Sequence, residues 1–180
     1  MVDVKLAIDY VLKQEDSRLT GAVTTLAGDN GGATRFGIAS AYHPELVAQG
    51  FYDPQRVGRD SALAMAERVY NVSYAAPLAL AGFNDQAIAT ALLSFGVNAG
   101  VSRAGELLQA ACVACGKPVV VDHKIGPGTL RAANSIDPGA LLDEFSAGAR
   151  RFYTTLAETH PQDARDLAGW LNRVTAWTTA

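Results

Sequence analysis

The chain has 180 residues, a length that suits one globular domain or two small lobes. A hydrophobic fraction of 49% against 18% charged residues supplies enough apolar surface for a packed interior and excludes an intrinsically disordered chain. The net charge of −3 gives no broad attraction to nucleic acid or to an anionic membrane surface, so we expect neither as a partner.

The N-terminal sequence is not typical of a secretory signal peptide. It carries Asp3 and lacks a basic cluster followed by an apolar run. No apolar stretch approaches the roughly 20 residues of a membrane-spanning helix. We therefore expect a protein that is made in the cytoplasm, is not inserted in a membrane, and depends on another protein to reach an external target.

Residues 4–15 predict an amphipathic helix, because apolar residues recur there at three- and four-residue steps. Continuing that stripe beyond Val11 and Leu12 places Glu15 on the core-facing side of the helix, at its C-terminal end. Burial and the helix dipole both favour a protonated carboxyl there, which is what a general acid for glycosidic cleavage requires. Periodicity leaves a second possibility open, in which the helix end frays and Glu15 turns to solvent.

The stretch from Asp16 to Gly37 is rich in glycine, threonine and small residues, and it predicts short hairpins or an irregular loop. Residues 22–26 are its most strand-like part. The only other strand-like segment is residues 119–121, which we expect to form a short strand and turn.

Helical patterns dominate the rest of the chain. The segment that follows Asn84 is apolar on nearly every face and predicts a buried central helix that stops at residues 98–100. We expect the other helices to begin at Asp60 or Ser61, at Ser102, at Asp137 and shortly before Leu167. The sequence therefore predicts a mainly α-helical (α+β) fold with one small β element after its first helix.

Cys112 and Cys115 form a single C-x-x-C near the end of a predicted helix. One such pair lacks the four ligands of a structural zinc site, so we expect two small, buried core residues. The three histidines, His43, His123 and His160, are scattered and offer no ligand spacing. We expect neither a metal nor an organic cofactor.

The segment from Asp29 to Ile38, D-N-G-G-A-T-R-F-G-I, follows Glu15 in an order that resembles glycoside hydrolase family 108, the phage and prophage muramidases. The motif of that family runs E-G-G-Y and then D-P-G-G-x-T-x-x-G-I. Here Asn30 replaces the proline, and E-D-S-R replaces E-G-G-Y. The interval from Glu15 to Asp29 is also longer than in the family, and Asp16 is the nearest substitute carboxylate, although adjacent residues diverge in direction.

The C-terminal half is similar to the peptidoglycan-binding region that accompanies this family, on residues 95–100, 107–109, 122–129 and 169–174. The resemblance therefore runs in matching order from about Val4 to Val174.

The resemblance implies a lysozyme-like helical domain with a small β-hairpin after the first helix. We expect residues 1–180 to form this single domain. Within it, residues 1–80 carry the catalytic motif, and residues 81–177 form a helical peptidoglycan-binding lobe that shares the same core.

The resemblance also implies a glycoside hydrolase that cleaves the β-1,4 bond between N-acetylmuramic acid and N-acetylglucosamine. It gives Glu15 the role of general acid, which protonates the leaving oxygen. Asp29 would stabilise developing positive charge or orient water, and Thr34 would hold that water.

Three further residues are candidates for binding the substrate, each with a structural alternative. Asn98 is expected to bond an N-acetyl group or a sugar hydroxyl, or else to cap its helix. Arg35 is expected to contact a muropeptide carboxylate, or else to be an ordinary exposed arginine. Tyr70 is expected beside a cleft, although its helical spacing favours core packing, as does that of Trp170.

Two other functions are open. A lytic transglycosylase would need the acid but no activated water, and would release a 1,6-anhydro product. A non-catalytic wall-binding or secretion-assisting module would need neither. The expected partner is peptidoglycan, and we expect a monomeric protein that acts on it in the periplasm. The protein would leave the cytoplasm through a holin, as a phage or prophage endolysin does in cell-wall lysis. The alternative route is a secretion system.

Overall fold

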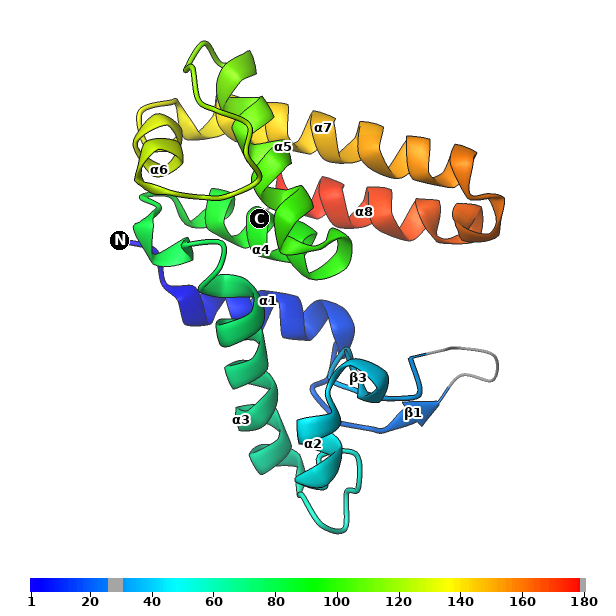
Figure 1. Cartoon of the computed structure of the whole chain (residues 1–180). Helices are drawn as coiled ribbons and strands as arrows, with labels where there is room; N and C mark the ends of the chain where they lie inside the picture. The colour runs from blue at the N-terminus through cyan, green and yellow to red at the C-terminus, as the bar shows by residue number, and fades with distance from the viewer. Residues whose placement is uncertain (26–30, 179–180) are drawn as a thin grey trace. The chain divides into compact units, whose positions relative to one another are not determined.

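The computed structural model describes residues 1–25 and 31–178 (Figure 1). It consists of two compact units, Ile8–Ser73 and Met1–Ala7 with Tyr74–Ala180. Within the described residues, no helix has both the length and the apolar composition needed to cross a membrane.

The unit Ile8–Ser73 contains most of the first helix and the whole sheet. Its elements are α1 (Val4–Glu15, which begins in the other unit), β1 (Thr24–Thr25), β2 (Ala33–Arg35), β3 (Ile38–Ala39), η1 (Ser40–Tyr42), α2 (Pro44–Ala48), α3 (Arg59–Tyr70) and the π-helical turn η2 (Asn71–Ala75), which runs on into the other unit. The expected β element after the first helix is therefore present.

The sheet is antiparallel with the order β1-β2-β3. Thr34 of β2 lies opposite Thr24 on one side and Ala39 on the other. Arg35 pairs with Ile38, so only two residues connect β2 to β3. A two-residue connection is the tightest hairpin, and it fixes the register of both strands.

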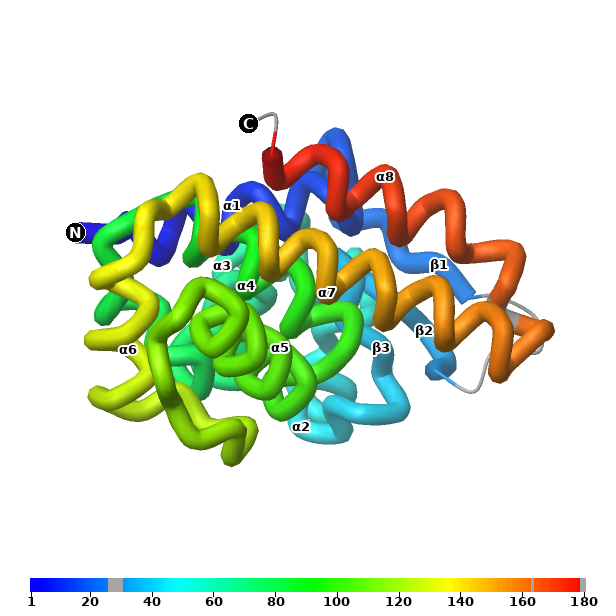
Figure 2. The backbone as a smooth tube through the Cα atoms, turned by 90° about the horizontal axis from the view of Figure 1, so that it is seen from above, coloured from blue at the N-terminus to red at the C-terminus, as the bar shows by residue number. Residues whose placement is uncertain are grey.

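The other unit is helical. Its elements are η3 (Leu80–Gly82), α4 (Gln86–Ala99), α5 (Val101–Ala114), α6 (Pro127–Ala133), α7 (Pro138–Thr159), η4 (Pro161–Asp166) and α8 (Leu167–Trp177). Helix α4 packs against α5, α7 and α8, which confirms that it is the buried central helix of its unit. Helices α7 and α8 lie side by side (Figure 2).

An aromatic cluster fills the core around α4. Phe95 is fully buried, and its ring meets those of Phe145, Phe152, Tyr153 and Trp177 edge to face at centroid distances of 5.7, 5.5, 5.5 and 6.4 Å. Trp170 stacks on Tyr153 at 5.1 Å. Edge-to-face and stacked pairs each add about 1 kcal/mol beyond the area that they bury. Trp170 therefore packs against the edge of this cluster and is half-buried.

The helix starts differ from the expected ones by a residue or two. Asp85, and not Asn84, caps α4, because its carboxylate accepts a hydrogen bond from the Ile88 amide at 3.0 Å. Gly100 precedes α5 in place of Ser102. Asp137 caps α7 as expected, accepting from the Ala140 amide at 3.0 Å.

Two sequence expectations in the helical unit are corrected. Residues 119–121 form no strand, because a side chain of α5 rather than a neighbouring strand holds the loop around them. Cys112 is buried as expected, but Cys115 is partly exposed, because it follows the last residue of α5.

Candidate active site

Glu15 is the last residue of α1, and its side chain is exposed. Val11 and Leu12, one turn earlier, are 0% and 1% exposed. Of the two possibilities that the periodicity left open, the structure has Glu15 turned to solvent, because the buried stripe ends one turn before the helix does. A carboxyl in this position is open to a substrate.

Gly37 lies directly against the Glu15 side chain. A Cβ atom on residue 37 would stand 2.7 Å from Cγ of Glu15 and 2.9 Å from its Cβ, which is closer than real Cβ contacts come. Gly37 also has φ +76°, a conformation that residues with a side chain rarely adopt. The hairpin therefore reaches the Glu15 side chain only because residue 37 is a glycine.

The turn that carries Gly37 is strained. Phe36 and Gly37 both have positive φ, of 51° and 76°, and together they form the two-residue turn between β2 and β3. Such a conformation costs a residue other than glycine about 1–2 kcal/mol. Burial of the Phe36 side chain, which is 2% exposed, offsets this cost.

Tyr70 fixes the same turn from α3. Its hydroxyl donates a hydrogen bond to the Phe36 carbonyl oxygen at 3.0 Å, and it would lie 2.7 Å from a Cβ on Gly37. Because Tyr70 is only 1% exposed, the structure contradicts its expected contact with substrate. Its position makes it a support for the turn beside Glu15.

Arg35 is buried as well, with 1% of its surface exposed. Its Nε donates to the Gly21 carbonyl oxygen at 2.8 Å, and its Nη1 donates to those of Phe51 at 2.6 Å and Val57 at 2.9 Å. Burial lowers the pKa of this guanidinium. Neither the expected muropeptide contact nor an exposed arginine is present, because the guanidinium donates to three carbonyl oxygens that belong to two loops of the unit, the one after α1 and the one between α2 and α3.

Thr34 precedes Arg35 in β2 and is half-buried. Neighbouring residues of a strand point to opposite faces, so Thr34 lies on the sheet face away from the buried arginine. The segment between β1 and β2 contains Asp29, which falls outside the described residues. The structure therefore brings together Glu15, Gly37 and the Phe36 carbonyl, and it places Thr34 in the same sheet.

Asp16 follows Glu15, but its carboxylate has a structural role. It accepts hydrogen bonds from the Gly21 amide at 2.8 Å and from the Thr20 hydroxyl at 3.0 Å. Burial raises the pKa of Asp16, but these hydrogen bonds outweigh burial and leave the pKa below its ordinary value. Asp16 holds the start of the loop after α1.

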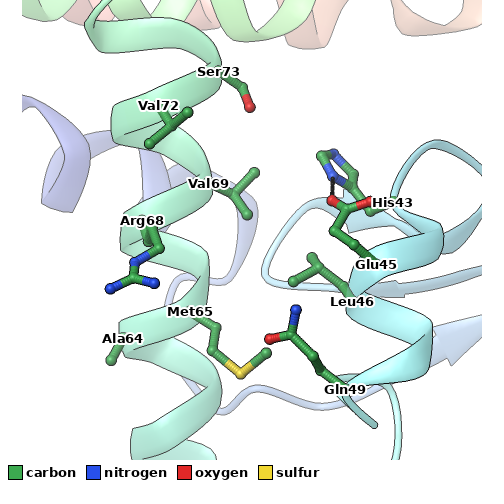
Figure 3. A pocket seen from close by; sticks show the side chains of 10 residues that line it. All are labelled: His43, Glu45, Leu46, Gln49, Ala64, Met65, Arg68, Val69, Val72 and Ser73. Carbon is green, nitrogen blue, oxygen red and sulfur yellow. Dashed lines mark hydrogen bonds and ion pairs between the residues drawn. The ribbon is translucent and has the colours of Figure 1, made fainter.

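A groove lies between α2 and α3, with a volume of about 470 Å³ (Figure 3). One wall carries His43 and Glu45, whose Nδ1 and Oε1 atoms lie 2.8 Å apart, and the other carries Met65 and Val69. Val69 precedes Tyr70, so α3 presents one face to the groove and another to the turn beside Glu15. The groove belongs entirely to the unit Ile8–Ser73.

Asn98 belongs to the other compact unit, near the end of α4. Its side chain is exposed, and its Oδ1 accepts a hydrogen bond from the Tyr153 hydroxyl at 3.0 Å. Burial raises the pKa of Tyr153, which therefore stays a neutral donor. Asn98 is oriented by this bond and does not cap α4, which ends at Ala99 and has Gly100 as its C-cap.

Sequence reasoning missed the roles of Gly37 and Tyr70. The available signal was the pair Phe36-Gly37, which has two strand-like residues on each side. Two residues between two strands is the length of the shortest hairpin turn. In the part of the chain that the structure describes, no three His, Cys, Asp or Glu side chains are grouped so that they could hold a metal ion.

Two family models match the chain. The model described as Glycosyl hydrolase 108 matches residues 8–100, and the model described as Predicted Peptidoglycan domain matches residues 103–175. No curated protein matches the chain. Among solved structures, that of Brucella abortus SagA is similar over 98% of this chain and 96% of its own, with a TM-score of 0.63 and 20% sequence identity. With the observed elements, this likeness confirms the mainly α-helical, lysozyme-like fold.

Proposed function

Because the chain belongs to glycosyl hydrolase family 108 and is a peptidoglycan hydrolase, we propose that Glu15 is the acid with which it cleaves the β-1,4 bond between N-acetylmuramic acid and N-acetylglucosamine. One observation carries this proposal. Glu15 ends α1 with an exposed side chain, and the strained Phe36-Gly37 turn packs against that side chain. Strain of this kind is concentrated at functional sites.

The proton transfer follows from this position. A glycan strand bound over Glu15 would exclude water from the carboxyl and bring the glycosidic oxygen within its reach. Glu15 then donates its proton to the glycosidic oxygen as the bond to the departing sugar breaks.

The second half of the reaction is assigned to Asp29 and Thr34. A carboxylate at Asp29 would stabilise the positive charge that develops on the sugar or orient a water molecule, and the Thr34 hydroxyl would hold that water. Carboxyl groups roughly 6.5–9.5 Å apart leave room for water and invert the anomeric centre, whereas about 5–5.5 Å leads to a retaining route through a covalent intermediate. The anomer of the first product distinguishes the two routes.

Among the substrate contacts expected from the sequence, Asn98 is the one we retain. Its side chain is exposed and is oriented by Tyr153, which suits a hydrogen bond to an N-acetyl group or a sugar hydroxyl. Arg35 and Tyr70 act indirectly, by holding the loops and the turn on which the site is built.

The biological setting that we propose is wall cleavage by a monomer that reaches the periplasm through a holin or a secretion system. It rests on the resemblance of residues 29–38 to the phage and prophage enzymes. Expression in a bacterial cytoplasm with and without a co-expressed holin tests it. Lysis that needs the holin supports an endolysin, and lysis without it contradicts that assignment.

The test of the chemistry compares wild type with Glu15→Gln on purified peptidoglycan, with the released fragments identified by mass spectrometry. Glu158→Gln, an exposed glutamate on α7, is the matched control. Reducing muropeptides that end in muramic acid, from wild type and the control but not from Glu15→Gln, support the proposal. Equal release by all three proteins contradicts the role of Glu15.

The same spectra decide between the hydrolase and the alternatives. Products that end in 1,6-anhydromuramic acid would identify a lytic transglycosylase. Absence of fragments from any of the proteins, on walls that a known lysozyme digests, would favour a wall-binding or secretion-assisting module.

A further inference from the structure

A second groove lies in the helical unit, between the loop that connects α5 to α6 and α6 itself. Its volume is about 560 Å³. The loop leaves the end of α5, folds back and enters α6 (Figure 1). The groove is formed within residues 109–135, and so within the segment that matches the Predicted Peptidoglycan domain.

Positive charge gathers in this groove. Lys117, Lys124 and Arg131 line it, against one acidic residue, Asp122. Lys117 and Arg131 form no ion pair with any described residue, so their charges are available to a ligand. The groove is therefore positively charged although the whole chain has a net charge of −3.

One buried side chain of α5 fixes the loop that bounds the groove. Gln109 is 1% exposed, and its Oε1 accepts hydrogen bonds from the backbone amides of Asp122 at 3.0 Å and His123 at 2.9 Å. Its Nε2 donates to the Asp122 carboxylate at 2.8 Å and to the Lys124 carbonyl at 2.9 Å. The same carboxylate accepts from the Lys124 amide at 3.0 Å, so the acidic residue is occupied by the loop itself.

The close approach of loop and helix has a second cause. A Cβ on Gly105 of α5 would stand 2.5 Å from the His123 carbonyl oxygen, so only glycine lets the loop lie there. The groove is therefore formed before any ligand arrives, and binding does not have to order the loop.

We propose that this groove binds the peptide stems of peptidoglycan, with Lys117, Lys124 and Arg131 holding the free carboxylates of the stem. The proposal rests on the chain being a peptidoglycan hydrolase. Carboxylates are the ligands that guanidinium and ammonium groups recognise. Val119 and Val120 line the same groove, and Val120 is 78% exposed, so an apolar surface is present for the methyl groups of alanine.

The lining favours the peptide over the glycan strand. None of the described residues that line this groove is aromatic, so it offers no flat ring on which a sugar could stack. The glycan backbone of N-acetyl sugars also brings no free carboxylate for three cations. The groove thus holds the uncut wall by its peptides, at a site separate from Glu15, which belongs to the other unit.

The test uses the full-length chain and the soluble stem tripeptide L-alanyl-γ-D-glutamyl-L-lysine, with binding measured by calorimetry at low and at high salt. The double variant Lys117→Gln/Arg131→Gln removes two charges from the groove. Arg151→Gln/Arg165→Gln removes two exposed charges elsewhere in the same unit and is the matched control. We expect the groove variant to bind at least about tenfold more weakly than wild type, and the control to bind as wild type does.

A second ligand checks the chemistry. The same tripeptide with amidated carboxylates is expected to bind at least about tenfold more weakly than the free acid. Three results would each overturn the proposal. The amidated peptide could bind as tightly as the free acid, or the groove variant could bind the free acid as tightly as wild type does. The third is that inorganic polyphosphate binds as tightly as the peptide. Should the double variant fail to give a normal thermal unfolding curve, single Arg131→Gln is measured in its place. Because the tripeptide has no glycosidic bond, these results do not depend on whether Glu15 is the acid.

Discussion

Gly37 lies so close to the side chain of Glu15 that a Cβ on residue 37 would stand 2.7 Å from Cγ of Glu15. It would also lie 2.7 Å from the Tyr70 hydroxyl oxygen. The room available to the Glu15 side chain thus depends on residue 37 having no side chain of its own.

Gly37→Ala is expected to lower kcat by at least about tenfold, because the new methyl group must push Glu15 away from the glycosidic oxygen. The left-handed φ of +76° adds a loss of stability of about 1 kcal/mol. Turnover of isolated peptidoglycan and thermal unfolding measure the two effects separately.

Gly50→Ala is the control that separates the backbone strain of a positive φ from the steric contact with Glu15. Gly50 has φ +78° in the same unit, but the atoms nearest to a Cβ there belong to the flexible Arg56 side chain, at 3.0 Å. This control is expected to lose similar stability and to keep its activity. A similar loss of activity in both variants would show that Gly37 matters only for folding.

Tyr70→Phe removes the hydrogen bond to the Phe36 carbonyl oxygen and leaves a buried acceptor without its donor. The expected loss of stability is about 1–3 kcal/mol. Because the turn beside Glu15 loosens, kcat should fall while KM stays nearly constant. Tyr42→Phe, at a site 75% exposed in the same unit, should change neither quantity.

A rise in KM for Tyr70→Phe at unchanged kcat would point instead to a substrate contact. That outcome would restore the role that the sequence suggested.

Arg35→Lys tests whether the buried guanidinium joins the loops. One ammonium group cannot reproduce donors at both Nε and Nη1, so at least one of the three carbonyl oxygens loses its partner. We expect the free energy of unfolding to fall by about 2–4 kcal/mol, as measured with urea. Arg56→Lys, at an exposed position, should change it by less than about 0.5 kcal/mol, and equal losses would contradict the structural role of Arg35.

The family matches and the packing assign helix α4 differently. By sequence it falls in the Glycosyl hydrolase 108 match, whereas by packing it belongs to the helical unit. The two family matches meet between residues 100 and 103, but α4 packs with α5, α7 and α8. A fragment of residues 103–178 lacks Phe95, around which the aromatic cluster of its unit is built. We expect this fragment to lack a cooperative thermal transition.

A fragment of residues 74–178 keeps α4 and is expected to unfold cooperatively and to give dispersed amide signals in NMR spectra. Cooperative unfolding of the shorter fragment would show that α5 to α8 form a core without α4.

The buried thiol of Cys112 makes stability depend on pH at the alkaline end. Burial, with a smaller contribution from Cys115, raises the pKa of Cys112 to about 11. The unfolded chain releases the Cys112 proton at the ordinary, lower thiol pKa. The contribution of this thiol to the free energy of unfolding is therefore complete below the ordinary pKa, and it is lost as the pH rises from there toward about 11, the pKa in the folded protein. Cys112→Ala should flatten the fall of the unfolding midpoint in this range, whereas the partly exposed Cys115→Ala should flatten it less.

The sequence by itself determined the order of most elements and offered Glu15 as the candidate acid. The apolar periodicity of residues 4–15 and the mostly apolar segment after residue 86 are local patterns, so the first helix and the buried central helix could be predicted from them. Glu15 could be named because its place at the end of a helix, before a glycine-rich loop, is also a matter of sequence order. Asp137 could be named as a cap for the same reason.

Only the tertiary structure decided which polar side chains face solvent. Arg35 looks like a surface or cleft residue in the sequence, yet it is buried, because carbonyl groups of two loops accept its hydrogen bonds. For Tyr70 the sequence left both a cleft and the core open, and the structure places it in the core, where the Phe36 carbonyl oxygen accepts its hydrogen bond. Periodicity left open whether Glu15 faces the core or solvent, and in the structure it is exposed, one turn beyond the buried Val11 and Leu12. Burial depends on what packs against a residue from elsewhere in the chain, and a local pattern does not contain that information.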